Sequence, residues 1–159
     1  MAGFGERGRL DPGEVREGEV VGAERLRVRY AETDQQAVVY HANFLEYFEV
    51  GRTAWIRDAG FPYSEMEEQG YALVVAEAHL RFMRPARYDD ILVVETRLSE
   101  LRTRSCTFTY RVIRETAEEV LVEGWTALVC LGPQGRAVPI PDHLARVMRT
   151  RAALGGKAV

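Results

Sequence analysis

The chain has 159 residues and a formal net charge of −3, with 47% hydrophobic and 28% charged residues. This length suits one domain with a single core, and the composition is that of an ordinary globular protein. A negative net charge argues against a nucleic-acid binder, because neutralising phosphates usually needs a basic excess. No stretch approaches the ~20 consecutive apolar residues of a membrane-spanning helix. The first residues also lack the apolar core of a secretory signal.

The two cysteines, Cys106 and Cys130, fall within predicted strands and have no CxxC or Cys/His neighbours. Two lone cysteines in a chain without an export signal are expected to stay reduced, which predicts a cytoplasmic location. We expect neither a metal ion nor a redox cofactor, because the sequence has no cluster of metal ligands and no glycine-rich phosphate loop.

The first half of the chain is predicted to hold a tail, a strand and a long helix. Residues 1–22 lack periodicity and predict a flexible tail before a domain at 23–150. Strict alternation of apolar and charged residues over 25–30 indicates a strand with one buried face. After a loop, apolar residues recur at helical spacing over about 41–58, and Gly60 followed by Pro62 ends this helix.

The second half is predicted to be mostly β. A short helical turn at 64–69 precedes the first of these strands. Proline, glycine and paired aspartates mark the turns between the strands, and Pro141 opens a short C-terminal helix before a tail at 151–159. One long helix followed by strands joined by short turns predicts an antiparallel α+β fold. The expected strands are 71–82, 91–101, 103–114 and 120–131.

The most informative segment is YAETDQQAVVYHANF, residues 30–44. It concentrates titratable groups in a loop that leads into a helix N-terminus, where unpaired N–H groups and the positive end of the helix dipole lie. A carbonyl oxygen held there would be polarised, and the negative charge of a tetrahedral intermediate would be stabilised. Asp34 can supply a carboxylate that attacks the carbonyl carbon or activates water.

The same residues have an ordinary structural interpretation. Asp, Thr and Asn are common in loops and caps, and Asn43 followed by Glu46 resembles a capping box. A single histidine such as His41 is more often a structural residue than a catalyst. Spacing alone therefore leaves both interpretations open.

As a whole, Y-x-x-T-D-x-x-x-V-V-Y-H-x-N-F resembles the signature of hotdog-fold acyl-CoA thioesterases. These are the 4-hydroxybenzoyl-CoA thioesterase type and its relatives associated with the bacterial Tol–Pal system. The likeness continues at 82–90, 94–96 and 102–105 and covers roughly residues 24–148. It implies a hotdog fold, in which an antiparallel five-stranded sheet wraps around the long helix. It also implies hydrolysis of acyl-CoA to a carboxylic acid and coenzyme A.

The resemblance assigns roles to three residues of the signature. Asp34 matches the catalytic carboxylate, acting as nucleophile or general base. His41 matches the helix-start residue whose backbone N–H points at the thioester carbonyl, and Tyr30 matches a tyrosine found near the carboxylate. The chain departs from the family at Ala37, where many members have Gly. A Cβ there is expected to alter the loop or narrow the pocket, which bears on substrate choice.

The resemblance also implies a coenzyme A site. Arg102, Thr103 and Arg104 match the basic segment that holds the nucleotide phosphates, and arginine forks bind phosphate bidentately. The alternative is that two arginines at a hairpin simply face solvent.

Other titratable residues receive weaker assignments. Glu49 and Arg52 lie one turn apart on the long helix and predict an ion pair. Glu49 is also a reserve catalytic carboxylate, because another branch of hotdog thioesterases uses a helix Glu. His79 is predicted to be structural and His143 exposed, and Cys106 is expected to be a small buried residue.

Five strands leave exposed sheet edges that a second subunit would cover. The resemblance implies a homodimer with one continuous sheet, commonly doubled to a homotetramer, with Asp34 of one chain facing the other chain's helix.

Two other functions stay open. One is a hotdog hydratase or dehydratase acting on acyl thioesters, and the other is a non-catalytic acyl-CoA or acyl-carrier-protein binding module.

Overall fold

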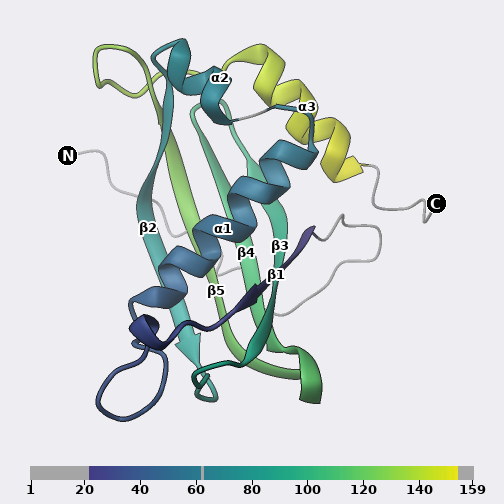
Figure 1. The fold of residues 1–159 in the computed structure, drawn as a ribbon. Helices are drawn as coiled ribbons and strands as arrows, with labels where there is room; N and C mark the ends of the chain where they lie inside the picture. Colours follow the sequence, from purple (N-terminus) through teal and green to yellow (C-terminus); the bar gives the residue numbers. More distant parts are fainter. Residues whose placement is uncertain (1–21, 62, 154–159) are drawn as a thin grey trace.

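The computed structural model describes residues 22–61 and 63–153. Its five strands form one antiparallel sheet in the order β1-β3-β4-β5-β2, so β1 and β2 are the edges. The long helix α1 lies across one face of this sheet, mainly over β1, β3 and β4 (Figure 1). In chain order the elements are β1 (Gly22–Arg27), η1 (Tyr30–Glu32), α1 (Asn43–Asp58), α2 (Tyr63–Glu68), β2 (Ala72–Phe82), β3 (Ile91–Leu101), β4 (Ser105–Arg114), η2 (Glu115–Ala117), β5 (Glu119–Leu131) and α3 (Asp142–Ala153).

This arrangement confirms the predicted hotdog fold, but several predicted boundaries are wrong by a few residues. The first strand ends at Arg27 because the chain turns into η1 at Tyr30. The long helix begins at Asn43 rather than at position 41. Thr103 lies in the turn before β4 rather than in the strand.

The predicted tails fall mostly outside the described residues. At their inner ends, Gly22 already belongs to β1, and α3 continues to Ala153. No helix in the described ranges is both long enough and apolar enough to cross a membrane.

The core forms between the inner face of the sheet and the apolar stripe of α1. Alternation in β4 turns Phe108 and Tyr110 toward the helix, and both are buried. The Phe48 ring stacks on Tyr110 with centroids 4.2 Å apart, and Trp55 meets Phe108 edge-on at 5.4 Å. Burying an aromatic or branched side chain contributes about 1.5–3 kcal/mol, so these contacts stabilise the helix on the sheet.

A glycine allows the closest approach of α1 to the sheet. A Cβ built on Gly51 would stand 2.8 Å from Val94 Cγ1, and it would also collide with Thr96 Oγ1. Both neighbours are fully buried side chains of β3. The lack of a side chain at this position therefore sets how tightly the helix packs.

We predict that Gly51→Ala lowers the free energy of unfolding by about 1–2 kcal/mol. Overpacking costs roughly 1–3 kcal/mol, and two contacts shorter than 3.0 Å place this site in the upper part of that range. The better helix propensity of Ala offsets ~1 kcal/mol of this cost, which leaves about 1–2 kcal/mol. Urea denaturation followed by circular dichroism measures the change. Val50→Ala is the matched control on the exposed side of the same helix and is expected to shift stability by less than about 0.5 kcal/mol. Equal stabilities for Gly51→Ala and the unmodified protein would show that the helix does not pack this closely.

Candidate functional site

A buried carboxylate ties the loop that carries Asp34 to the start of α1. Glu32 is only 8% exposed, and its side chain accepts hydrogen bonds from the Tyr47 hydroxyl at 3.0 Å and from the Arg29 N–H at 2.8 Å. The Glu32 carbonyl accepts two more, from Asn43 Nδ2 at 2.8 Å and from the Tyr40 N–H at 2.9 Å. The beginning of the loop, its end and the helix are thereby joined at one residue.

This arrangement corrects the capping-box interpretation of Asn43. The N-cap residue is Ala42, which makes no side-chain capping bond. The Asn43 side chain instead reaches back to the loop. Burial, and to a smaller extent the hydrogen bond to Glu32, raise the pKa of Tyr47 on α1 above its ordinary value. Tyr47 therefore stays a hydrogen-bond donor at neutral pH.

Asp34 begins a tight turn that orients its side chain. Its N–H donates to the Val38 carbonyl at 2.9 Å, and its own carbonyl accepts from the Ala37 N–H at 2.9 Å. The carboxylate oxygen Oδ1 accepts from the Gln36 N–H at 2.8 Å. Ala37 adopts a left-handed conformation with φ 59°, a region that favours glycine. An alanine here, in place of the glycine of many thioesterases of this type, thus places backbone strain in the turn.

Asp34 and His41 line the same pocket, which has a volume of about 340 Å³. The structure therefore brings together the two residues to which the sequence assigns the central roles. The walls are mainly apolar, with one arginine and one glutamine among them. The lining consists of Asp34, Gln36, Val38, Val39, His41, Phe44, Phe82, Met83, Arg84 and Pro85.

The entrance to α1 leaves a backbone donor at this pocket. The N–H groups of Asn43 and Phe44 donate to the carbonyls of Tyr40 and His41. The N–H of His41 donates to no acceptor within the described residues. A free N–H at the positive end of a helix can stabilise a developing oxyanion. The same mainly apolar pocket is thus lined by a carboxylate and by a residue whose backbone N–H has no partner within the described residues.

Two residues expected near the pocket do not line it. Tyr30 is 77% exposed, and its ring packs edge-on against Tyr88 with centroids 5.6 Å apart. Ala37 is also absent from the lining, so its Cβ does not narrow the pocket within one chain. Its effect lies in the backbone of the turn.

Arg102, Thr103 and Arg104 are exposed in the turn between β3 and β4. Arg102 bonds to Glu100 in an ion pair of 2.6 Å. This turn lies at the end of the sheet opposite to the loop of Asp34 (Figure 1), and the 11 residues of β3 span about 35 Å. The structure does not bring these residues to Asp34 within one chain.

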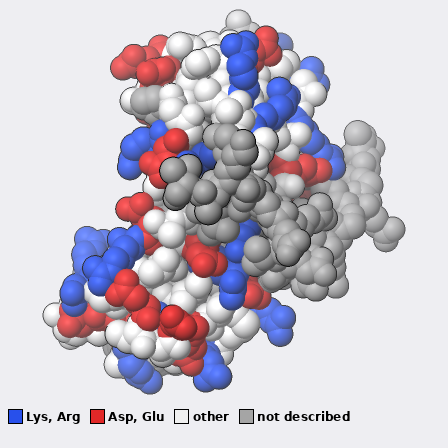
Figure 2. All heavy atoms as spheres, turned by 90° about the vertical axis from the view of Figure 1, so that its right-hand side faces the viewer, with Lys and Arg blue, Asp and Glu red and all other residues white. Residues whose placement is uncertain are grey.

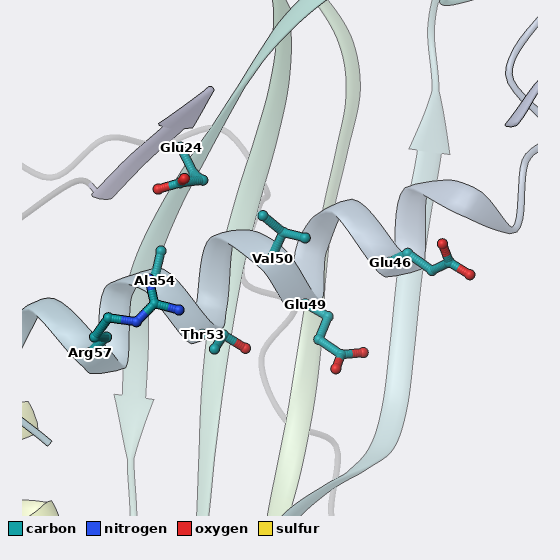
Figure 3. A pocket seen from close by; sticks show the side chains of 7 residues that line it. All are labelled: Glu24, Glu46, Glu49, Val50, Thr53, Ala54 and Arg57. Atoms are coloured by element: carbon teal, nitrogen blue, oxygen red, sulfur yellow. The ribbon is translucent and has the colours of Figure 1, made fainter. Parts of the chain in front are cut away.

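A second hollow, of about 510 Å³, lies on the outer side of α1 and contains the reserve carboxylate Glu49 (Figure 3). Glu24 of β1 and Arg57 at the other end of the helix also line it. Asp34 is not part of this lining, so Glu49 and Asp34 do not share a site within one chain.

The predicted ion pair between Glu49 and Arg52 is wrong. Arg52 turns toward the sheet and is 8% exposed. Its Nη1 donates to the Tyr110 hydroxyl at 3.1 Å and to Thr126 Oγ1 at 3.5 Å. The helical stripe of Phe44 and Phe48 continues to position 52 and carries this side chain inward.

The positions of the other two histidines and of Cys106 are as follows. His79 is exposed and stacks on Trp125 at 6.0 Å, and His143 is exposed as predicted. Cys106 is buried as expected, and burial raises the pKa of its thiol to about 12. A buried thiol with a raised pKa supplies little thiolate at neutral pH, which argues against a role as nucleophile.

Sequence reasoning missed Glu32 and Arg84. Glu32 lies in a polar loop with no periodic signal of burial. Arg84 lines the pocket, and its Nε lies 2.9 Å from Glu119 Oε1, a contact between segments distant in sequence.

Acidic and basic side chains are interspersed over the described part of the face in Figure 2. Anion binding on that face would therefore depend on local groups rather than on a field of one sign.

Comparisons with known proteins give consistent matches. The family model of the thioesterase-like superfamily matches residues 28–148. The acyl-CoA thioester hydrolase YbgC of Escherichia coli O6:H1 is 34% identical over 118 residues, which are 72% of this chain and 87% of that protein.

Two solved structures agree with these matches. The crystal structure of the hypothetical protein TT1821 from Thermus thermophilus has a TM-score of 0.78 at 40% identity and covers 81% of this chain and 98% of that one. The DHNA-CoA thioesterase of Staphylococcus aureus has a TM-score of 0.78 at 28% identity, covering 87% and 97%. Each match therefore covers most of both chains.

We predict that Tyr47→Phe lowers the free energy of unfolding by about 1.5–3 kcal/mol, because it removes a donor from a buried carboxylate. Urea denaturation measures the loss. Tyr40→Phe is the matched control, since the Tyr40 hydroxyl makes no hydrogen bond to the described residues, and its stability should stay nearly unchanged. If both variants behave alike, Glu32 does not hold the loop to the helix.

Proposed function

Since the chain belongs to the thioesterase-like superfamily, we propose that it hydrolyses acyl-CoA thioesters to a carboxylic acid and coenzyme A. The observation that carries this proposal is the pocket shared by Asp34 and His41. A thioester needs an attacking oxygen on one side and a donor for its carbonyl oxygen on the other. Both groups are present there, beside apolar walls suited to an acyl group.

In the proposed reaction, the N–H of His41 binds the thioester carbonyl oxygen and stabilises the oxyanion. Asp34 either attacks the carbonyl carbon or removes a proton from the attacking water. The carbon–sulfur bond then breaks, and the thiolate of coenzyme A takes up a proton. On the attack route, water afterwards hydrolyses the acyl anhydride on Asp34. The hydrogen bond from Gln36 to Oδ1 fixes the carboxylate, while Oδ2 accepts none within the described residues.

The distance between Asp34 and the Arg102 segment supports a proposed homodimer. The edge strand β2 exposes Val74 and Val75, and pairing with a second copy would cover this edge. Two β2 strands pairing antiparallel about a two-fold axis would bring opposite ends of the two sheets together. The Arg102, Thr103 and Arg104 turn of one chain would then approach Asp34 of the other. A substrate as long as coenzyme A would have both sites within reach.

Other features of the proposal stay predictions. A homotetramer would need a further interface on the homodimer. Tyr30 would contribute only if the second chain brings its phenol to the pocket. The proposed reaction needs no metal ion or redox cofactor, and a cytoplasmic location remains the prediction from the sequence.

The rival functions predict different products. A hotdog hydratase would add water to crotonyl-CoA without releasing thiol, and a binding module would retain acyl-CoA unchanged. The Asp34 loop is not the His/carboxylate arrangement of a hydratase. Thiol release and hydration measured together on one set of short, long, branched and aromatic acyl-CoA esters separate all three.

We predict that Asp34→Asn folds normally and loses roughly 10²- to 10⁴-fold in kcat, the usual contribution of a positioned acid–base group. The amide oxygen of the new side chain can still accept the Gln36 N–H, so the turn should persist. Thiol release from acyl-CoA measures turnover, and circular dichroism checks the fold. Asp58→Asn is the control, because this exposed carboxylate lies on α1 outside both described pockets.

Asp58→Asn should retain the turnover of the unmodified protein. Activity of Asp34→Asn at that same level would remove Asp34 from the mechanism. The corresponding loss in Glu49→Gln would instead assign the chemistry to the helix carboxylate.

A further inference from the structure

Arg52 is a buried cation without a carboxylate partner. Its side chain is more than nine-tenths buried, and no Asp or Glu of the described residues lies within ion-pair distance of it. Its only hydrogen-bond partners there are the hydroxyls of Tyr110 and Thr126, and both are bound by the same nitrogen, Nη1. These two hydroxyls also bond to each other at 2.6 Å.

Such an arrangement is costly unless something else meets the charge. A buried ion that is not paired is strongly destabilising, and buried polar groups almost always have partners. Nε and Nη2 of Arg52, however, have no hydrogen-bond acceptor among the described residues. Neither of these two atoms is completely enclosed by the protein. These two nitrogens are therefore the groups that a ligand would meet.

A line of apolar side chains leads from the Asp34 pocket to this cation. We call it the β2 strip; it consists of Phe82, Leu80 and Ala78, which share one face of β2 because they alternate along the strand. Phe82 lines the Asp34 pocket and is 51% exposed. At the other end, Ala78 pairs directly with Thr126, whose hydroxyl contacts Arg52, so the strip ends beside the guanidinium.

The helix follows the same course. His41 and Phe44 at the start of α1 line the pocket, and Phe48 and Arg52 continue the same helical stripe at i+4 intervals. The Phe44 and Phe82 rings meet edge-on, with centroids 5.8 Å apart. Pocket, strip and cation are therefore successive parts of one face of the chain.

The lengths fit an acyl chain of medium size. Four residues of β-strand, from Phe82 to Ala78, span about 13 Å. An extended hydrocarbon of roughly ten carbons covers the same distance. An acyl group whose carbonyl lies at Asp34 and His41 would thus place its far end beside Arg52.

We propose that the acyl chain lies along the β2 strip and that Arg52 binds a carboxylate at its far end. The preferred substrates are then coenzyme A monothioesters of medium-chain dicarboxylic acids. This inference rests on the proposed function, since it places the thioester at Asp34. Arg52 is a specificity-determining residue in this account and takes no part in bond breaking.

The test compares two stable thioethers of coenzyme A that differ only at the far end: S-decyl-CoA and its ω-carboxylate. Calorimetry gives their affinities without any turnover. The unmodified protein should bind the ω-carboxylate at least about tenfold more tightly, the scale of a hydrogen bond to a charged group. Arg52→Met should abolish the difference, and Arg52→Lys should keep part of it. Arg57→Met, which removes an exposed guanidinium from the same helix, should keep all of it.

Equal affinities of the unmodified protein for the two thioethers would overturn the proposal, even if Arg52→Met failed to fold. A preference that survives in Arg52→Met would overturn it as well. In that case Arg52 serves the fold or meets a carboxylate of a second chain, and the variant changes only thermal stability or oligomeric state. Thiol release from the two corresponding thioesters, measured in parallel, tests the proposed function separately. Failure to release thiol leaves the binding comparison decisive for Arg52.

Discussion

The site depends on the buried carboxylate of Glu32. This residue accepts hydrogen bonds from the loop on both its sides and from two side chains of α1. This tie, together with the buried side chain of Val39, holds the loop against the N-terminus of α1. Glu32 therefore helps to fix the positions of Asp34 and His41 at one pocket, although it takes no part in the proposed chemistry. Burying this charge is tolerated because each of its oxygens is bonded.

The single chain provides only part of the proposed site for a coenzyme A thioester. The loop that carries Asp34 lies at one end of the sheet, and the turn between β3 and β4 lies at the other (Figure 1). The open edge strand β2 offers a way to bring these two segments together. Antiparallel pairing of this edge with a second copy would place opposite ends of the two sheets side by side. The same strand carries the β2 strip on the face toward α1. Assembly, phosphate binding and acyl binding would then all depend on one strand.

Periodicity was sufficient to predict the strands and the long helix, because the two faces of each element differ sharply in polarity. The sequence could also predict that Asp34 and His41 line the same pocket, because both lie close to one helix start in the sequence. Glu32, Arg52 and Arg84 were not predictable in the same way. Each is a charged residue with a tyrosine, threonine or glutamate partner at least 15 positions away, although Glu32 also bonds to the nearby Arg29. Only the folded chain brings such partners together, and the local helical spacing predicted Glu49 as the partner of Arg52 instead.

The most direct test of this account is a crystal structure of the Asp34→Asn variant with an acyl-CoA thioester bound. We expect the thioester carbonyl oxygen to lie within hydrogen-bonding distance of the His41 N–H, with the carbonyl carbon beside the substituted side chain at position 34. A thioester bound instead in the hollow on the outer side of α1, next to Glu49 and away from the start of the helix, would contradict it.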